Sequence, residues 1–120
     1  MRVQELLDAC LTMQGAYIGL PFGKEPICAR VGRHNFAEVY PSKGWATFHC
    51  EAERGLEWRS LFPQDVRRGY YCPPSQQPYN VTAELDGGVP DDVLLLMARE
   101  SYARALRKMT KAERAEITQG

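Results

Sequence analysis

One segment, from Glu84 to Leu106, constrains the fold more than any other part of this chain. Its sequence, ELDGGVPDDVLLLMARESYARAL, predicts the end of a strand, a tight turn at Gly87-Gly88, and a helix that begins near Pro90. Proline is tolerated in the first turn of a helix, and the two aspartates that follow it complement the positive end of the helix dipole. The apolar residues of the helix recur with helical spacing and are Val93, Leu94, Met97, Tyr102, Ala105 and Leu106. We therefore expect a strand followed directly by an amphipathic helix.

Three short strands are predicted in the first half of the chain, at residues 27–31, 36–40 and 45–50. Turn residues separate them at Gly32-Arg33 and at Pro41–Gly44. In the third strand, Ala46, Phe48 and Cys50 share one face, and Trp45, Thr47 and His49 share the other. Such alternation predicts an antiparallel meander in which one face is covered.

The remaining segments complete the predicted order of elements. We expect helices at residues 3–13 and 51–61, a loop at 19–23, strands at 66–72 and 79–85, and a short last helix after Thr110, which forms a capping box with Glu113. In the middle helix, Leu56, Trp58 and Leu61 are the expected inward positions. This order predicts the α+β class, as one domain over residues 1–120. The architecture is a two-layer sandwich with a mostly antiparallel sheet, helices packed on one face, and an α-β-α order.

Composition narrows the range of functions. The chain carries 15 basic and 15 acidic residues, and this balance disfavours tight binding to nucleic acid over the whole surface, because such binding needs several phosphate contacts. No apolar run approaches the roughly 18 residues of a membrane span, and the first residues lack the apolar core of a signal peptide. We expect a cytoplasmic protein that is not inserted in a membrane.

The residues that could carry chemistry form no recognisable catalytic or metal site. The four cysteines contain no C-x-x-C pair, and His49 and Cys50 are adjacent in a strand, so their side chains point to opposite faces. We interpret His34 and His49 as surface or packing residues. Ser101 lies in mid-helix without a G-x-S-x-G turn, and we interpret it as a contact on the helix surface. The sequence thus predicts no enzyme activity, no metal and no cofactor.

Four short motifs occur in a distinctive order: Pro21-Phe22-Gly23, Gly69-Tyr70-Tyr71, Leu85-Asp86-Gly87 and Ser101-Tyr102. In this order and spacing the chain resembles the MmcQ/YjbR family over nearly its whole length. The resemblance implies a CyaY-like, frataxin-like fold and a DNA-binding role through a "double-wing" surface. The chain departs from the family in one place, because Tyr79 and Asn80 stand where the family usually has His-Trp after a lysine.

A DNA-binding surface would use the basic residues of the predicted hairpins and loops. Our candidates are Arg30, Arg33, Lys43, Arg67, Arg68 and Tyr70, where arginines contact phosphates and an aromatic ring stacks on a base. Two alternatives stay open. One is a protein-interaction module that docks a partner through the loop from Pro73 to Pro78, and the other is a domain that binds a small ligand between sheet and helices.

Overall fold

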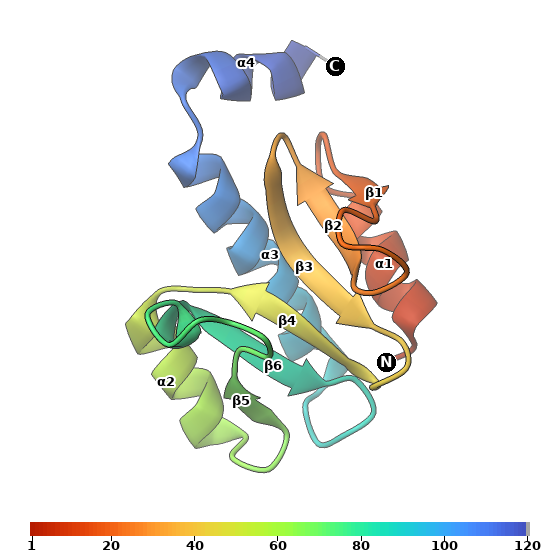
Figure 1. Cartoon of the computed structure of the whole chain (residues 1–120), viewed down its shortest axis with the longest axis vertical. Coiled ribbons are helices and arrows are strands. Elements are labelled where there is room, and N and C mark those ends of the chain that lie inside the picture. The colour runs from red at the N-terminus through yellow and green to blue at the C-terminus, as the bar shows by residue number, and fades with distance from the viewer. Residues whose placement is uncertain (120) are drawn as a thin grey trace.

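The computed structural model describes residues 1–119 of the chain (Figure 1). The helices are α1 (Val3–Leu11), α2 (Ala52–Leu61), α3 (Asp91–Lys108) and α4 (Lys111–Gln119), with a short 3-10 helix at Gln77–Tyr79. The strands are β1 (Tyr17–Gly19), β2 (Ile27–Val31), β3 (His34–Tyr40), β4 (Trp45–His49), β5 (Val66–Arg68) and β6 (Asn80–Glu84).

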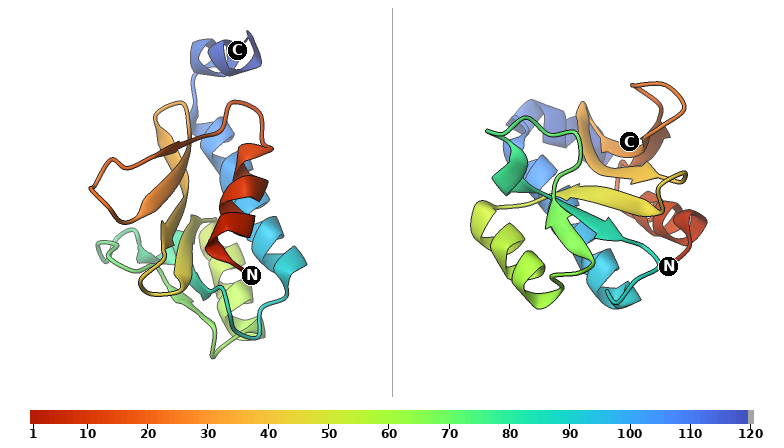
Figure 2. Two further views of the ribbon diagram at one scale, coloured as in Figure 1. Left: turned by 90° about the vertical axis from the view of Figure 1, so that its right-hand side faces the viewer. Right: turned by 60° about the horizontal axis from the view of Figure 1, so that its bottom comes forward.

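The strands form one antiparallel sheet in the order β1-β2-β3-β4-β6-β5. Helices α1, α2 and α3 all lie on one side of this sheet, while loops project from the other side (Figure 2, left). We call the side without helices the open face. The predicted α+β two-layer architecture is therefore confirmed. None of the helices within residues 1–119 is long and apolar enough to cross a membrane.

Alternation along the central strands builds the core between the sheet and the helices. Ala46 and Phe48 of β4 point toward the helices, where Leu94 and Met97 of α3 meet them, and all four are at most 2% exposed. Burying a side chain such as leucine or phenylalanine contributes about 1.5–3 kcal/mol. The strand periodicity and the helix periodicity thus converge on one apolar layer, as the sequence predicts.

Helix α2 differs from the prediction in the face that it buries. Trp58 is buried as expected, but Leu56 and Leu61 are 57% and 63% exposed. The inward position is instead Gly55, where an added Cβ atom would lie only 3.1 Å from the carbonyl oxygen of Pro78. Helix α2 therefore lies very close to the backbone of Pro78 at Gly55. This close approach, rather than the burial of leucines, determines which face of the helix is inside.

Two smaller differences concern strand boundaries. The predicted loop at residues 19–23 is preceded by an unpredicted edge strand, β1, and the predicted strand at 66–72 ends at Arg68. After Gly69, the amide of Tyr70 donates to the side-chain oxygen of Thr82 instead of a backbone carbonyl, and Tyr71 adopts a positive φ of 61°. A left-handed residue cannot continue a strand. At the other end of the chain, the Thr110 capping interaction is confirmed, because its hydroxyl accepts the amide of Glu113.

Candidate functional site

The sheet splits between its two central strands. Ala29 pairs with Ala37 and Arg30 with Asn35, so Phe36 is an extra residue in β3, which makes a β-bulge. A bulge bends its strand and increases the local twist. Strands β3 and β4 are paired only from Tyr40↔Trp45 to Ala37↔Phe48, and beyond that point they diverge in front of α3 (Figure 1). A gap thus opens at the upper end of the sheet.

Ser101 of α3 closes this gap at its base. Its hydroxyl accepts the backbone N–H of His49 at 2.9 Å and donates to the carbonyl of Phe36, so it replaces the missing contact between the two strands. Its side chain is fully buried. The interpretation of Ser101 as a helix-surface contact is therefore wrong, since the residue faces the sheet. The neighbouring Tyr102 ring packs edge-on against Phe36, with 5.3 Å between ring centroids.

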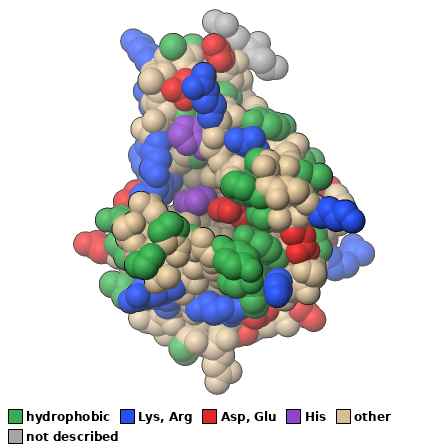
Figure 3. Space-filling view, in the orientation of Figure 1, with side chains coloured by type: hydrophobic (Ala, Val, Ile, Leu, Met, Phe, Trp, Pro, Cys, Tyr) green, Lys and Arg blue, Asp and Glu red, His purple; other side chains and the backbone are tan. Residues whose placement is uncertain are grey.

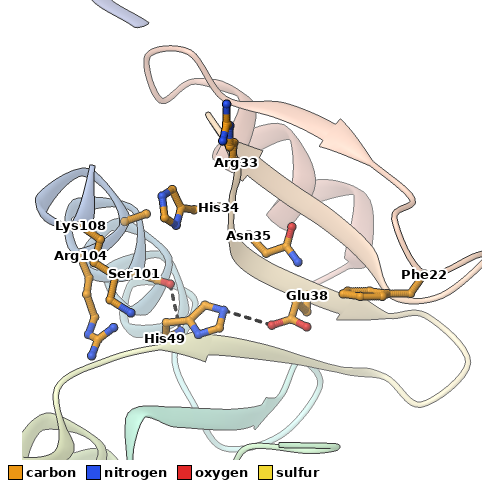
Figure 4. Close-up of a pocket in the computed structure, with 10 residues that line it drawn as sticks. Phe22, Arg33, His34, Asn35, Glu38, His49, Ser101, Arg104 and Lys108 are labelled. Atoms are coloured by element: carbon orange, nitrogen blue, oxygen red, sulfur yellow. Dashed lines mark hydrogen bonds and ion pairs between the residues drawn. The ribbon is translucent and has the colours of Figure 1, made fainter. Parts of the chain in front are cut away.

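Above Ser101 the split is a cleft of about 360 Å³ that opens on the open face. We call it the split-sheet cleft, and its walls come from the loop before β2, the β2–β3 turn, β3, β4 and α3 (Figure 4). Its lining residues are Phe22, Arg33, His34, Asn35, Glu38, His49, Ser101, Arg104, Ala105 and Lys108. Figure 3 shows both histidines of the chain on this face, with basic side chains beside them.

Positive charge predominates among these side chains. Within residues 1–119, no carboxylate lies at ion-pair distance from Arg33 or Lys108. Arg104, in contrast, lies 3.2 Å from Glu51, which is outside the cleft. The pKa of Lys108 is lowered, first because burial disfavours its charged form and then because Arg104 repels it. The cleft therefore holds cations that repel one another, and an anion placed between them would relieve that repulsion.

The acidic side chain of the cleft, Glu38, faces a histidine. Its Oε1 lies 3.1 Å from Nε2 of His49, within ion-pair range, although the two groups are not aligned for a hydrogen bond. His34 is 3.9 Å from a carboxylate oxygen of Glu113 on α4. The side-chain oxygen of Asn35 is buried and has no hydrogen-bond partner within the described part of the chain. These groups can together contact a ligand that is partly anionic and partly polar.

A second cavity, of about 330 Å³, continues across the open face from the first. Phe22 and Glu38 line both cavities, and the second is otherwise lined by Glu25, Pro26, Tyr40, Tyr70, Tyr71 and Cys72. Tyr70 stands at the centre of an aromatic cluster: its ring centroid is 4.0 Å from that of Tyr71 and 5.0 Å from the nearer ring of Trp45. Burial, together with the nearby Glu38, raises the pKa of Tyr40 to about 12. The open face is thus cationic at one end and aromatic at the other.

The structure brings three of the predicted DNA-contacting residues together, at edge strand β5 and the loop after it. Arg67 pairs with Glu84 at 3.0 Å, and its guanidinium lies 4.4 Å from the Trp45 ring centroid, so most of its binding capacity is used within the protein. Arg68 is exposed at the edge. Tyr70 is half-buried beneath Tyr71, which is 81% exposed. Arg68 and Tyr71 are consequently the groups most open to a ligand here.

The other three candidates lie elsewhere. Arg30 packs along β2, where it donates to the carbonyl of Arg33 and lies 5.9 Å from the Tyr17 ring centroid. Arg33 is exposed at the β2–β3 turn, and Lys43 is exposed at the β3–β4 turn. Since β3 separates these two turns, they stand at opposite ends of the strand. The six residues are therefore spread around the margins of the sheet and do not form a single patch.

The sequence reasoning missed the histidines as members of a site. His34 and His49 belong to different strands, and only the bulge at Phe36 and the divergence of β3 from β4 bring them to one cleft. Glu38, the ion-pair partner of His49, lies four residues after His34 in β3. It was a usable signal, because it is an acidic residue within a strand that is otherwise largely apolar. Tyr79, in the region where the chain departs from the resemblance, lies against Arg104, with 5.5 Å between guanidinium and ring centroid.

These features define a class: a small α+β domain with a split antiparallel sheet and a cleft on its open face. The YjbR family model matches residues 11–104. The chain belongs to the YjbR family. No curated protein matches it.

Two solved structures share the fold. One is the crystal structure of a Deinococcus radiodurans protein with a DUF419 domain, with a TM-score of 0.87 and 29% identity; the match covers 98% of this chain and 88% of that one. The other is a Pseudomonas syringae protein, with a TM-score of 0.68 and 14% identity over 84% of this chain and 96% of that one. The second likeness shows the fold alone.

Proposed function

We propose that this protein binds DNA through the open face of its sheet and the β5 edge beside it, and catalyses no reaction on it. The observation that carries the proposal is the pairing of an exposed aromatic ring with an exposed cation at one sheet edge. Tyr71 is 81% exposed and stacks on Tyr70, and Arg68 is exposed at the β5 edge, two residues after buried Val66 and so on the helix side of that strand. An arginine can contact a phosphate while an aromatic ring contacts a base or sugar.

The distribution of the other cations supports the same face. Arg33 and Lys43 lie in the turns at the two ends of β3, and both are exposed. A long polyanion that runs along the strand could therefore contact both. The zero net charge of the chain is no obstacle, because the relevant quantity is the charge of one face. A binding role without catalysis accords with the Ser101 hydroxyl, which is committed to two backbone groups.

The test is fluorescence anisotropy of a labelled random-sequence duplex, titrated at 50 and 200 mM salt, with a single strand of the same length alongside. Three phosphate contacts predict a loss of about 40-fold in affinity between these salt concentrations. An Arg68→Ala/Tyr71→Ala double variant should weaken binding at low salt. The matched control is Arg99→Ala, which removes an exposed cation of α3. Absence of binding at 50 mM salt would overturn the proposal and turn attention to a protein partner at the Pro73–Pro78 loop.

A further inference from the structure

The split-sheet cleft is a site of its own, and its contents differ from those of the Arg68–Tyr71 edge. Arg104 and Lys108 line its α3 wall one helical turn apart, and Arg33 lies apart from them at the β2–β3 turn. A planar carboxylate offers two oxygens, whereas a phosphate group offers three strong acceptors directed tetrahedrally. Two cationic side chains one helical turn apart on the same wall favour the phosphate, since its three oxygens can contact both.

We propose that the cleft binds a nucleoside monophosphate, with its phosphate against Arg104 and Lys108 on the α3 wall. The reason for an organic phosphate is size. A volume of about 360 Å³ lies in the range of small-molecule sites. The cleft also runs along β3 from His34 to Glu38, which is a distance of roughly 13 Å at about 3.3 Å per residue. A free phosphate ion would leave most of this cleft empty.

The order of groups along the cleft matches the order of groups in a nucleotide. Arg104 and Lys108 stand at one end, the carboxylate of Glu38 in the middle, and the ring of Phe22 at the other end (Figure 4). A carboxylate accepts hydrogen bonds from ribose hydroxyls, and an exposed aromatic ring stacks on a base. Phe22 is 66% exposed, so its ring is free to take that position.

The negative charges near the site do not cancel the cations. Glu38 faces His49, at 3.1 Å, and lies between His49 and Phe22. Glu113 of α4 approaches His34, at 3.9 Å, and Glu51 pairs with Arg104 and Arg107 from outside the cleft. None of these three carboxylates lies within ion-pair distance of Lys108 in residues 1–119. Asn35 adds an amide whose oxygen is buried without a partner there.

The test is calorimetric titration of the intact protein with adenosine 5′-monophosphate, adenosine and ribose 5-phosphate. The monophosphate should bind at least about 10-fold more tightly than adenosine, since a charged hydrogen bond is lost without the phosphate. Lys108→Met should weaken monophosphate binding by about 10-fold for the same reason, whereas Lys111→Met, an exposed lysine of the next helix, should change it by less than about two-fold. Arg104→Gln is a second variant of the cleft.

Two further ligands test whether the bound phosphate belongs to a free nucleotide or to the end of a nucleic-acid strand. A short single-stranded oligonucleotide is titrated with and without a 5′-phosphate. If only the phosphorylated strand shows the Lys108 dependence and binds more tightly than the monophosphate, the ligand is a strand end; if the monophosphate binds more tightly, it is a free nucleotide. Equal binding of adenosine and its monophosphate, equal effects of Lys108→Met and Lys111→Met, or no binding at millimolar concentration would each overturn the proposal. It does not rest on DNA binding, because Arg68→Ala/Tyr71→Ala leaves the cleft intact.

Discussion

Replacing Ser101 by alanine tests whether one hydroxyl joins the two halves of the split sheet. The hydroxyl partners two backbone groups, the N–H of His49 and the C=O of Phe36. Leaving a buried backbone group without a partner costs about 1–3 kcal/mol. Two such groups cost about 2–6 kcal/mol, and the better helix propensity of alanine returns about 0.5 kcal/mol. We therefore expect the free energy of unfolding to fall by about 1.5–5.5 kcal/mol.

The assay is urea unfolding, with a thermal melt as a second measurement. At about 4 °C per kcal/mol for a domain of this size, the Tm should fall by roughly 6–22 °C. The matched control is Ser60→Ala on α2, which makes the same chemical change at an exposed helical position and should shift stability by less than about 0.5 kcal/mol.

Hydrogen exchange makes the test specific to the two backbone groups. In the Ser101→Ala variant, the amide of His49 loses its acceptor and should exchange faster than the fall in global stability alone explains. The amide of Phe48 lies in the paired part of β4, so it should follow global stability only. A variant that keeps its stability within about 0.5 kcal/mol and retains full protection at His49 would refute the bridging role.

Three further perturbations have outcomes that follow from burial. Trp58→Ala should cost about 3–5 kcal/mol in urea unfolding because Trp58 is 4% exposed, while Leu61→Ala at a 63% exposed position should cost less than about 1 kcal/mol. Burial raises the pKa of Cys10 to about 12, so stability is full below about pH 9 and falls as pH rises toward 12; urea midpoints should show this decline, and Cys10→Ala should make it shallower. Gly69→Ala should lower the Tm, because its Cβ would lie 2.5 Å from that of Asn80.

The architecture was predictable because periodicity in the sequence reports burial directly. The alternation at Ala46 and Phe48 places apolar groups on one face whatever the neighbouring strand does, and the spacing of Leu94 and Met97 does the same for α3. Helix α2 shows where this reasoning fails. Its exposed leucines fit a helical pattern, but the close approach at Gly55 selects another face, and a glycine leaves no hydrophobic signal.

The cleft was not predictable from the residues that line it. Every residue from His34 to Tyr40 is compatible with a regular strand, and the extra residue at Phe36 is visible only when β2 and β3 are aligned in space. A bulge is a property of a pair of strands, so a single strand carries no sign of it. Basic residues in the last turns of α3 suit the helix dipole without any ligand, so their positions in the sequence do not indicate a site. Only the split in the sheet gives Arg104 and Lys108 access to the open face.

The same bulge explains why residues of a helix and of the open face can share one site. A continuous sheet would separate α3 from ligands on the opposite side, whereas the divergence of β3 and β4 exposes part of α3 between them. Ser101 holds this opening at its base, so structure and binding are linked there. Ser101→Ala should therefore lower both stability and monophosphate affinity, while Lys108→Met should lower affinity alone. If Ser101→Ala, titrated well below its Tm, keeps the full affinity, the cleft does not depend on the bridge.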